Sequence, residues 1–211
     1  MALDVVRVRE RLPQREVVWL ETTGSTMGDA ARLAAAGCPQ GTAVVAEEQT
    51  AGQGRHGRSW HSEKGAGLYV SIVLRPQLPA GSILTLTLAL GLATQEAILH
   101  ATGIACDLKW PNDILAGGKK CAGILAQRTG EAVISGIGIN VNQETFPADI
   151  RGLATSLRML SGRVQSREDL LVHLLLSVDK YMKLLHEEGS PWIIGLFSRA
   201  SRKGRDHAAG S

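Results

Sequence analysis

The sequence predicts a single α+β domain in which helices cover a mixed, mainly antiparallel sheet. The length of 211 residues, with 44% hydrophobic content, allows one substantial core but is short for two full domains. Short apolar runs of strand length also occur between longer runs with helical spacing. Helix, sheet and helix layers are expected from this arrangement.

Seven runs carry the β-branched or apolar residues that are typical of strands. They cover residues 16–21, 42–48, 68–74, 105–110, 114–116, 119–127 and 132–139. The last four runs follow one another closely. Gly117 and Gly118 supply the positive φ angles of a tight hairpin, and Thr129 with Gly130 makes another turn. These four runs therefore predict a meander, which is mainly antiparallel.

Three longer segments are expected to be helices. A capping box of Thr26 and Asp29 opens the first, which ends at Gly37. Residues 83–101 are rich in Leu and Ala and predict a long, largely buried second helix. Ser166 and Asp169 cap the third, whose leucines recur at helical spacing.

The last residues, 198–211, carry four Arg or Lys side chains, two glycines and no large apolar side chain. This composition predicts a basic, disordered tail, because too little apolar surface is available to offset the entropy of ordering it. The folded domain is therefore expected to cover residues 1–197.

Charge and cysteine content limit the classes of function. A formal net charge of +3 suits an anionic nucleotide or an acidic partner protein, but is small for a dedicated nucleic-acid binder. Three widely spaced cysteines without a CxxC pattern are typical of reduced thiols in a cytoplasmic protein. The N-terminus is charged, and Gln95 and Glu96 interrupt the most apolar stretch, so neither a targeting signal nor a membrane span is expected.

The glycine-rich loop Gly52–Trp60 is the most informative segment. Its glycines free the backbone to wrap a ligand, Arg55 and Arg58 can face anionic oxygens, and Trp60 can cover a flat ring. Its GxGxxG pattern does not fit a dinucleotide fold, because the residues after it cannot open a stable helix, and no Walker sequence occurs. Taken alone, the segment fits a mobile surface loop with solvated arginines equally well.

Five separated motifs stand in a fixed order along the chain. They are Ser25-Thr26, Gln49 with the glycine-rich loop, Lys109-Trp110-Pro111-Asn112-Asp113, Lys120-Cys121-Ala122-Gly123-Ile124-Leu125, and Gly136-Ile137-Gly138-Ile139-Asn140-Val141-Asn142. In this order they closely resemble the catalytic domain of biotin protein ligases, from about Val17 to Gly189. The resemblance implies the class II aminoacyl-tRNA-synthetase-like fold of biotin and lipoate ligases. It also implies an ATP-dependent ligase that forms biotinyl-5′-AMP and transfers biotin to a lysine of a biotin carboxyl carrier protein, as in acetyl-CoA carboxylase.

This reaction brings two anions together, so cationic side chains and Mg²⁺ are expected to dominate catalysis. Biotin and ATP with Mg²⁺ are the implied substrates, and the Mg²⁺ ligands are not identified. By the resemblance, Arg55 and Lys120 contact the biotin carboxylate and the α-phosphate, while Arg58 and Lys109 face the departing pyrophosphate. A solvated surface charge is the alternative for each, but the position of Lys120 inside a strand favours an inward role.

The resemblance also assigns the biotin site. Its residues are Ser25, Thr26, Gln49, Gln53, Gly54, Arg55, Lys120 and Gly123. The first three match positions that bind the ureido group, although helix capping explains Ser25 and Thr26 equally well. Met27 departs from the pattern, because many relatives have a polar residue there.

The remaining assignments concern the nucleotide and the acceptor. Trp60 matches a position against the adenine, and Asn112 and Asn140 match positions near the nucleotide; a core Trp and a turn Asn are the alternatives. Asp113 would help the acceptor lysine as a base or by orienting it, because an amine attacks only when it is neutral. Asp113 could instead stabilise a turn or bind Mg²⁺.

Relatives usually continue into a small C-terminal β-barrel domain, and regulatory members carry an N-terminal DNA-binding domain. This sequence has no residues for either, so we expect no DNA binding and no membrane partner. The expected partners are biotin, ATP and the carrier protein, and the resemblance is compatible with a homodimer. Two alternatives remain: a lipoyl or octanoyl transferase of the same fold, and a nucleic-acid-binding module suggested by Arg55, Trp60 and the basic tail.

Overall fold

The computed structural model describes residues 2–76 and 83–208. One seven-stranded sheet lies at its centre, with strand order β1-β2-β3-β7-β6-β5-β4. The strands are β1 (Val17–Thr23), β2 (Ala43–Gln49), β3 (Leu68–Leu74), β4 (Asp107–Lys109), β5 (Asp113–Ala116), β6 (Lys119–Thr129) and β7 (Ala132–Ile139). β1 and β2 are parallel and every other neighbouring pair is antiparallel. The predicted mixed, mainly antiparallel sheet is confirmed.

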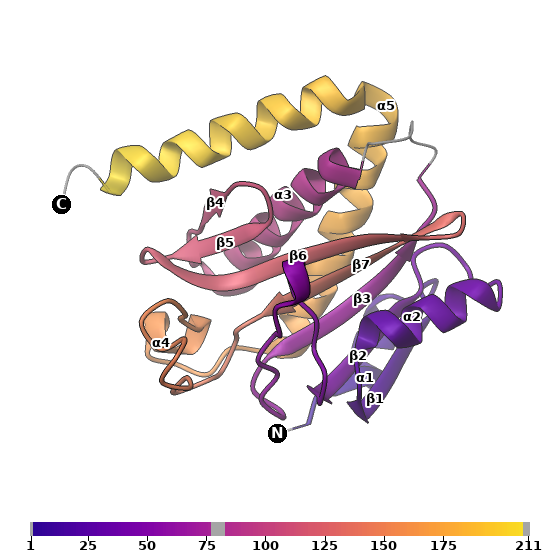
Figure 1. Ribbon diagram of the computed structural model, residues 1–211, viewed down its shortest axis with the longest axis horizontal. Coiled ribbons are helices and arrows are strands. Elements are labelled where there is room, and N and C mark those ends of the chain that lie inside the picture. The colour runs from indigo at the N-terminus through magenta and orange to yellow at the C-terminus, as the bar shows by residue number, and fades with distance from the viewer. Residues whose placement is uncertain (1, 77–82, 209–211) are drawn as a thin grey trace.

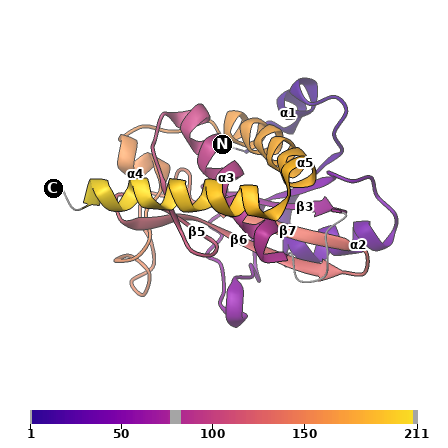
Figure 2. The same ribbon diagram turned by 90° about the horizontal axis from the view of Figure 1, so that it is seen from above.

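Helices cover both faces of this sheet (Figures 1 and 2). They are α1 (Val5–Arg11), α2 (Thr26–Ala35), α3 (Ile83–Thr102), α4 (Leu157–Ser161) and α5 (Arg167–Ala208), with a 3₁₀ turn η1 (Arg55–Gly57). α1, α3 and α5 lie on one face, whereas α2 and the glycine-rich loop lie on the other. The α+β layering expected from the sequence is therefore confirmed.

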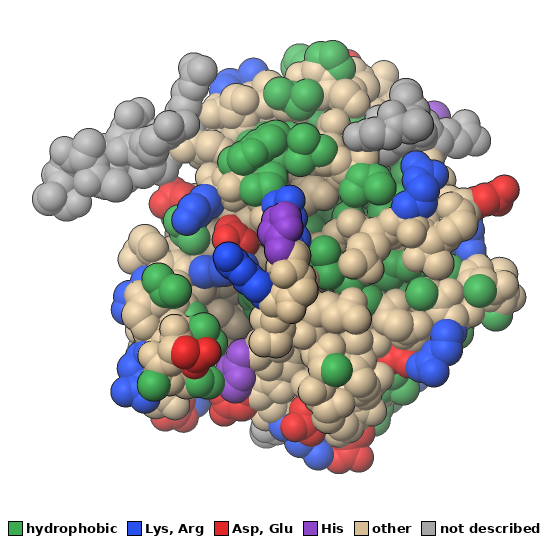
Figure 3. Space-filling view, in the orientation of Figure 1, with side chains coloured by type: hydrophobic (Ala, Val, Ile, Leu, Met, Phe, Trp, Pro, Cys, Tyr) green, Lys and Arg blue, Asp and Glu red, His purple; other side chains and the backbone are tan. Residues whose placement is uncertain are grey.

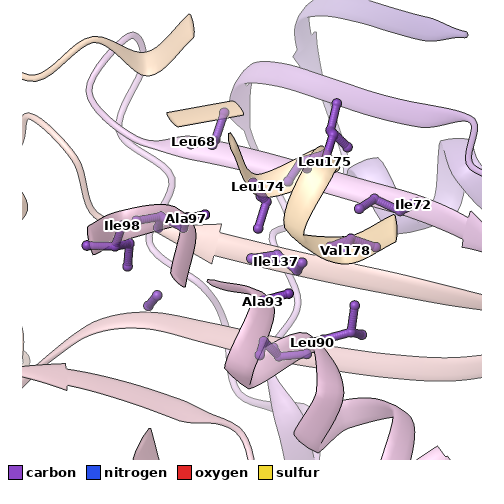
Figure 4. Close-up of a cluster of buried hydrophobic side chains, with 14 of the residues drawn as sticks. Leu68, Ile72, Leu90, Ala93, Ala97, Ile98, Ile137, Leu174, Leu175 and Val178 are labelled. Carbon is purple, nitrogen blue, oxygen red and sulfur yellow. The ribbon is translucent and has the colours of Figure 1, made fainter. Parts of the chain in front are cut away.

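The alternation of side chains along the central strands divides the two faces. On β3, Leu68 and Ile72 belong to the main hydrophobic core, whereas Tyr69 and Ser71 line a cavity on the opposite face. Figure 4 shows the core side, where side chains of the sheet meet those of α3 and α5. The labelled residues are Leu68, Ile72, Leu90, Ala93, Ala97, Ile98, Ile137, Leu174, Leu175 and Val178. The main hydrophobic core thus occupies one face of the sheet, and the cavity lies on the opposite face, which carries α2.

Helix α3 is long and apolar enough, by length and composition, to cross a membrane. However, 67% of its most apolar window is buried inside the protein. The sheet and α5 supply this burial, as Figure 4 illustrates for Leu90 and Ala93. A helix that is hydrophobic on all sides is typical of a protein core.

The N-terminus of α2 differs from the predicted capping box. Ser25 is the N-cap and makes no side-chain cap bond, while Asp29 accepts a 2.6 Å hydrogen bond from the hydroxyl of Thr23. The hydroxyl of Thr26 turns inward to Gln49 instead. The prediction was wrong because a pattern of capping residues cannot show that a buried partner competes for the hydroxyl.

Helix α5 begins as predicted, since the backbone N–H of Asp169 donates to the Ser166 hydroxyl at 3.1 Å. It bends at Gly189 (φ 77°, ψ −179°), and its second half then runs across α3 (Figure 2). Residues 198–208 continue the helix, in place of the disordered tail expected there, and residues 209–211 lie outside the described residues. Phe197 is buried and lies 6.1 Å from the Trp110 ring, so it anchors a helix that propagates easily once formed.

A buried ion pair joins the sheet to α5. Arg167 Nη1 lies 2.9 Å from Glu47 Oε2, and both side chains are at most 5% exposed. Glu47 also accepts hydrogen bonds from the Leu3 backbone at 2.6 Å and from Trp19 Nε1 at 3.2 Å. Burial alone would raise the pKa of the Glu47 carboxyl, but the hydrogen bonds from Arg167 and Leu3 hold it below the ordinary 4.5. Three parts of the chain therefore meet at one carboxylate.

Candidate functional site

A cavity opens on the face of the sheet that carries α2. It encloses about 460 Å³ of empty space, a figure that includes its open mouth. Strands β3, β6 and β7 form its floor, and the N-terminus of α2 and the glycine-rich loop form its walls. Many of the predicted site residues line it: Ser25, Thr26, Gln49, Gln53, Gly54, Arg55, Trp60, Asn112, Lys120 and Gly123. We call it the first cavity.

A second cavity adjoins the first. Its lining residues are Arg58, Ser59, Trp60, His61, Lys120, Asn140, Phe146, Ile150, Leu153 and Ala154, and it holds about 650 Å³ of empty space including its mouth. Trp60 and Lys120 line both cavities, so the two spaces meet at these side chains. Figure 3 looks onto the face that carries the loop, where Lys, Arg and His side chains gather near the centre.

A β-bulge places Lys120 in the site. Leu115 pairs with Lys120 and Ile114 pairs with Ala122, so one residue of β6 has no partner on β5. That residue is Cys121, and the neighbouring Lys120 bonds to another segment through its backbone N–H, which donates to the Leu153 carbonyl at 2.8 Å. In a regular strand Lys120 and Gly123 would face opposite ways, but the bulge turns both toward the first cavity.

The ammonium group of Lys120 has two close partners. Its Nζ lies 2.7 Å from Asp113 Oδ1, and both side chains are about one-third exposed. The same Nζ lies 5.3 Å from the centre of the Trp60 ring, a distance typical of a cation–π contact. The ion pair and the ring together hold the charge at the junction of the two cavities. Asp113 and Lys120, both predicted as catalytic, are thus brought together.

Arg55 is held by Asn112. Arg55 Nη1 donates to Asn112 Oδ1 at 3.0 Å. Asn112 is fixed in turn, because its Nδ2 donates to the Ile124 carbonyl at 3.1 Å and its own carbonyl accepts the Ile124 N–H at 3.0 Å. Asn112 therefore aims a guanidinium group into the first cavity.

The Trp60 ring lies directly over two glycines of the floor. Gly123 and Gly138 are paired across β6 and β7. A Cβ on Gly123 would come within 2.9 Å of the Trp60 ring, and one on Gly138 within 2.4 Å. The indole Nε1 is buried, and the described residues give it no hydrogen-bond partner. The absence of side chains at these two positions is therefore required for the ring to lie there.

The inner end of the first cavity is polar. Gln49 Oε1 accepts hydrogen bonds from the Thr26 N–H at 2.9 Å and the Thr26 hydroxyl at 3.1 Å, and that hydroxyl lies 2.8 Å from Ser71 Oγ. Gln49 Nε2 donates to Ser62 Oγ at 3.0 Å. Ser25 Oγ is buried and has no partner among the described residues. A buried, unpaired hydroxyl is a costly feature that a polar ligand would satisfy.

Some predicted residues lie away from the first cavity. Arg58 lines only the second cavity, and the exposed Lys109 lines neither. Asn140 lines the second cavity, but its side-chain amide is engaged by the backbone, donating to Thr155 at 3.1 Å. The Asn140 side chain therefore holds the segment around Thr155, while its predicted role near the nucleotide stays a prediction.

Sequence reasoning missed other residues of the first cavity, including Tyr69, Ser71, Gly136 and Gly138. The alternation of β3 and β7 is the signal that would have found them, since alternate residues of both strands share the face of α2. Tyr69 is satisfied internally: its hydroxyl donates to the Glu63 carbonyl at 2.9 Å. Burial raises the pKa of Tyr69 above its usual range, so its hydroxyl stays neutral.

Comparison with known proteins places the chain in a family. Residues 19–144 match the model of the biotin/lipoate A/B protein ligase family. The chain is 43% identical over 173 residues to the bifunctional ligase/repressor BirA of Bacillus spizizenii, covering 79% of this chain and 53% of that protein. It is 37% identical to the biotin–[acetyl-CoA-carboxylase] ligase of Mycobacterium tuberculosis, covering 76% of this chain and 62% of that one.

Solved structures agree. The biotin protein ligase of Aquifex aeolicus in complex with biotin and ATP superposes with a TM-score of 0.79 at 36% identity, covering 86% of this chain and 76% of that chain. The ligase of Leishmania major in complex with biotinyl-5-AMP gives 0.77 at 28% identity, covering 90% and 82%. The chain spans only about half the length of the BirA relative. The chain belongs to the biotin/lipoate A/B protein ligase family.

Proposed function

We propose that the chain is an ATP-dependent biotin–protein ligase that forms biotinyl-5′-AMP and transfers biotin to a lysine of a biotin carboxyl carrier protein. One observation carries the proposal: two cavities meet at a half-buried lysine, and one of them ends in a polar cluster in which the Ser25 hydroxyl has no partner among the described residues. The lining of the first cavity, polar at its inner end and apolar along the strands of its floor, suits a cyclic urea with an apolar tail. A nucleotide fits the second, where Trp60 and Phe146 offer flat rings.

In the first reaction, a carboxylate oxygen of biotin attacks the α-phosphorus of ATP, and the bond to the pyrophosphate breaks. Lys120 and Arg55 bring positive charge to the junction where the two anions meet. Such preorganised charges act most strongly on the charge that develops in the transition state. Arg58 lines the second cavity, which supports its proposed role of facing the departing pyrophosphate.

In the second reaction, the amine of the acceptor lysine attacks the acyl carbon of the adenylate, and AMP leaves. The amine must first lose a proton, and Asp113 is the carboxylate nearest to Lys120 at 2.7 Å. When the phosphate of the adenylate engages Lys120, the carboxylate of Asp113 is released to orient the amine and take its proton. This exchange gives the two side chains separate roles in successive steps.

ATP enters the reaction as its magnesium complex. The described residues contain no group of three His, Cys, Asp or Glu side chains that could hold a metal ion. Mg²⁺ commonly binds through substrate phosphates with one or two carboxylates. The phosphates are therefore expected to carry the ion, and Asp113, which lines neither cavity but pairs with Lys120 at their junction, is the candidate carboxylate.

The location and the acceptor are also part of the proposal. Cys38, Cys106 and Cys121 are free thiols, and Cys106 Sγ lies 3.9 Å from Cys121 Sγ, which fits a reducing compartment such as the cytoplasm. A carrier protein is the acceptor implied by the name of the Mycobacterium tuberculosis relative. A homodimer remains compatible with the proposal.

Thermal unfolding with added ligands tests the proposed function. Biotin and Mg-ATP together should raise Tm by more than the sum of their separate effects, because the adenylate spans both cavities and binds more tightly than either reactant. Biotin-dependent release of pyrophosphate should accompany the shift. Additive shifts without pyrophosphate release would contradict the proposal.

The same assay separates the alternatives. Pyrophosphate release with lipoate or octanoate in place of biotin would indicate a lipoyl-type ligase, which the named biotin ligase relatives do not favour. Oligonucleotide binding that depends steeply on salt and ignores biotin would indicate a nucleic-acid-binding module. Against the latter, Arg55 and Trp60 line a cavity.

A further inference from the structure

Ser62 lies outside the motifs of the sequence but links the two cavities. It follows the glycine-rich loop and is buried. Its Oγ accepts a hydrogen bond from Gln49 Nε2 at 3.0 Å and lies 3.4 Å from the Trp60 carbonyl oxygen. One hydroxyl thus touches the inner end of the first cavity and the main chain of the residue that separates it from the second.

The hydrogen bonds around Ser62 form a chain with one direction. The Gln49 oxygen faces the Thr26 N–H, which can only donate, so the Thr26 hydroxyl also donates to it. The single hydroxyl hydrogen of Thr26 is then used, and Ser71 must donate to Thr26. At the other end, Gln49 donates to Ser62, which leaves the Ser62 hydrogen to the Trp60 carbonyl. Ser71 and the Trp60 carbonyl are therefore the two ends of the chain.

The packing around Ser62 is tight. A Cβ on Gly52 would lie 2.8 Å from the Trp60 carbonyl oxygen, 3.0 Å from Ser62 Oγ and 3.1 Å from Gln49 Nε2. The Gly52 carbonyl accepts the Trp60 N–H at 2.9 Å. Both the N–H and the carbonyl of Trp60 are thus hydrogen-bonded. Because the side chains here are closely packed, a movement of the Gln49 amide has to be accompanied by a movement of Ser62 and the Trp60 backbone.

We propose that Ser62 is a positioning residue that transmits occupation of the first cavity to Trp60, and so to the second cavity. The inference rests on the proposed function, in which the first cavity binds biotin. The two N–H bonds of Gln49 belong to one planar amide, so a ligand that accepts one of them fixes the direction of the other, which Ser62 receives. Biotin binding therefore fixes the Trp60 backbone through Ser62 before the nucleotide arrives.

The test compares nucleotide affinity with and without biotin. The probe is α,β-methylene ATP with Mg²⁺, which cannot form the adenylate, and calorimetry gives its Kd in both conditions. In the parent protein, biotin should tighten the binding of the probe. In Ser62→Ala this enhancement should fall about two- to tenfold, the effect expected for one internal hydrogen bond. Affinity for biotin alone should change less.

Two further variants separate positioning from general damage. Ser62→Thr keeps a hydroxyl and should restore the enhancement. Thr50→Ala removes a hydroxyl on the other side of the glycine-rich loop, one that is exposed and lies 3.4 Å from the Thr23 carbonyl, and should leave the enhancement intact. An unchanged Tm in Ser62→Ala shows that the fold is intact.

Equal enhancement in Ser62→Ala and the parent overturns the inference. A parent that binds biotin and the probe independently overturns it as well, while leaving the ligase proposal to the pyrophosphate assay. A parent that binds no biotin refutes the proposed function and this inference together, and calorimetry with biotin alone reveals that case.

Discussion

Lys120 owes its place in the site to an irregularity in its strand. The bulge opposite β5 turns Lys120 and Gly123 to the same face, and the pairing with Asp113 fixes the ammonium group at the junction of the cavities. The neighbouring Lys119 is exposed. Two adjacent lysines with the same intrinsic chemistry therefore have different environments, which makes them a natural pair for comparison.

Lys120→Ala should nearly abolish formation of the adenylate. Loss of a charge that acts in the transition state typically costs about 3–4 kcal/mol, or roughly a hundred- to thousandfold in rate. Biotin binding without ATP should weaken much less, because the polar groups at the inner end of the cavity are untouched. Biotin-dependent pyrophosphate release measures the effect. Lys119→Ala is the control and should be nearly silent, and equal rates for Lys120→Ala and the parent would refute the assignment.

Gly138→Ala should disturb Trp60. Its new Cβ would lie 2.4 Å from the ring, so the indole must move, and forced overpacking typically costs about 1–3 kcal/mol. We expect the KM for ATP to rise about tenfold and the tryptophan fluorescence of the free protein to change. Gly28→Ala on α2 is the control, since the space around Gly28 is open. The same KM in both variants would show that the ring does not depend on the glycine floor.

Among the elements, the strands were the most predictable and the helix ends the least. All seven strands lie within two residues of the expected bounds, because β-branched runs between glycine turns are a strong signal. The start of α2 and the part of α5 around Phe197 contact distant partners instead, Gln49 and Trp110. The motifs likewise led to most of the first cavity, but local sequence could not show the bulge at Lys120 or the link through Ser62.

The bend in α5 makes a prediction at the level of this element. Gly189 has φ 77° and ψ −179°, a conformation that is essentially restricted to glycine. Gly189→Ala should therefore destabilise the protein by about 1–3 kcal/mol. Gly195→Ala, further along the same helix, should be neutral or stabilise by up to about 1 kcal/mol, because its Cβ meets only Arg199 at 3.6 Å. Chemical denaturation measures both, and equal effects would contradict the role of the bend.

At the scale of the whole molecule, the Glu47–Arg167 pair joins the sheet to α5 across 120 positions of sequence. It stands on the core face, opposite the site, and it receives the N-terminal segment through Leu3. Buried ion pairs of this kind contribute little net stability relative to a hydrophobic replacement, but losing one partner is costly. We therefore expect the pair to fix the relative positions of β2, α5 and the N-terminal segment more than to add net stability.

Arg167→Met should destabilise the fold by about 3–5 kcal/mol, because it leaves the Glu47 carboxylate buried without its main partner. Denaturant unfolding at neutral pH measures the change. The double variant Glu47→Gln with Arg167→Met should recover part of the loss, since no buried charge remains. Equal stability of Arg167→Met and the parent would refute the importance of the pair.

The same carboxylate predicts an acid dependence. The pKa of Glu47 is lowered in the folded state, so its contribution to stability is present above the unfolded pKa and is lost as pH falls through the folded pKa. Stability should therefore fall below about pH 4.5, and Glu47→Gln should fall less steeply over that range. Unfolding free energies measured between about pH 7 and pH 3 test this. Parallel slopes for the two proteins would contradict it.

The order of strands in the sheet has a consequence for biosynthesis. Strand β3 pairs with β2 along one edge and with β7 along the other. The second edge of residues 68–74 therefore stays unpaired until residues 133–139 have been synthesised. Every residue of β3 is buried in the finished protein. A nascent chain that has not yet reached β7 exposes this apolar strand, and such long-range pairing folds slowly and invites aggregation. A strand of the floor of the ligand site is thus also a segment that stays unprotected while the chain is being synthesised.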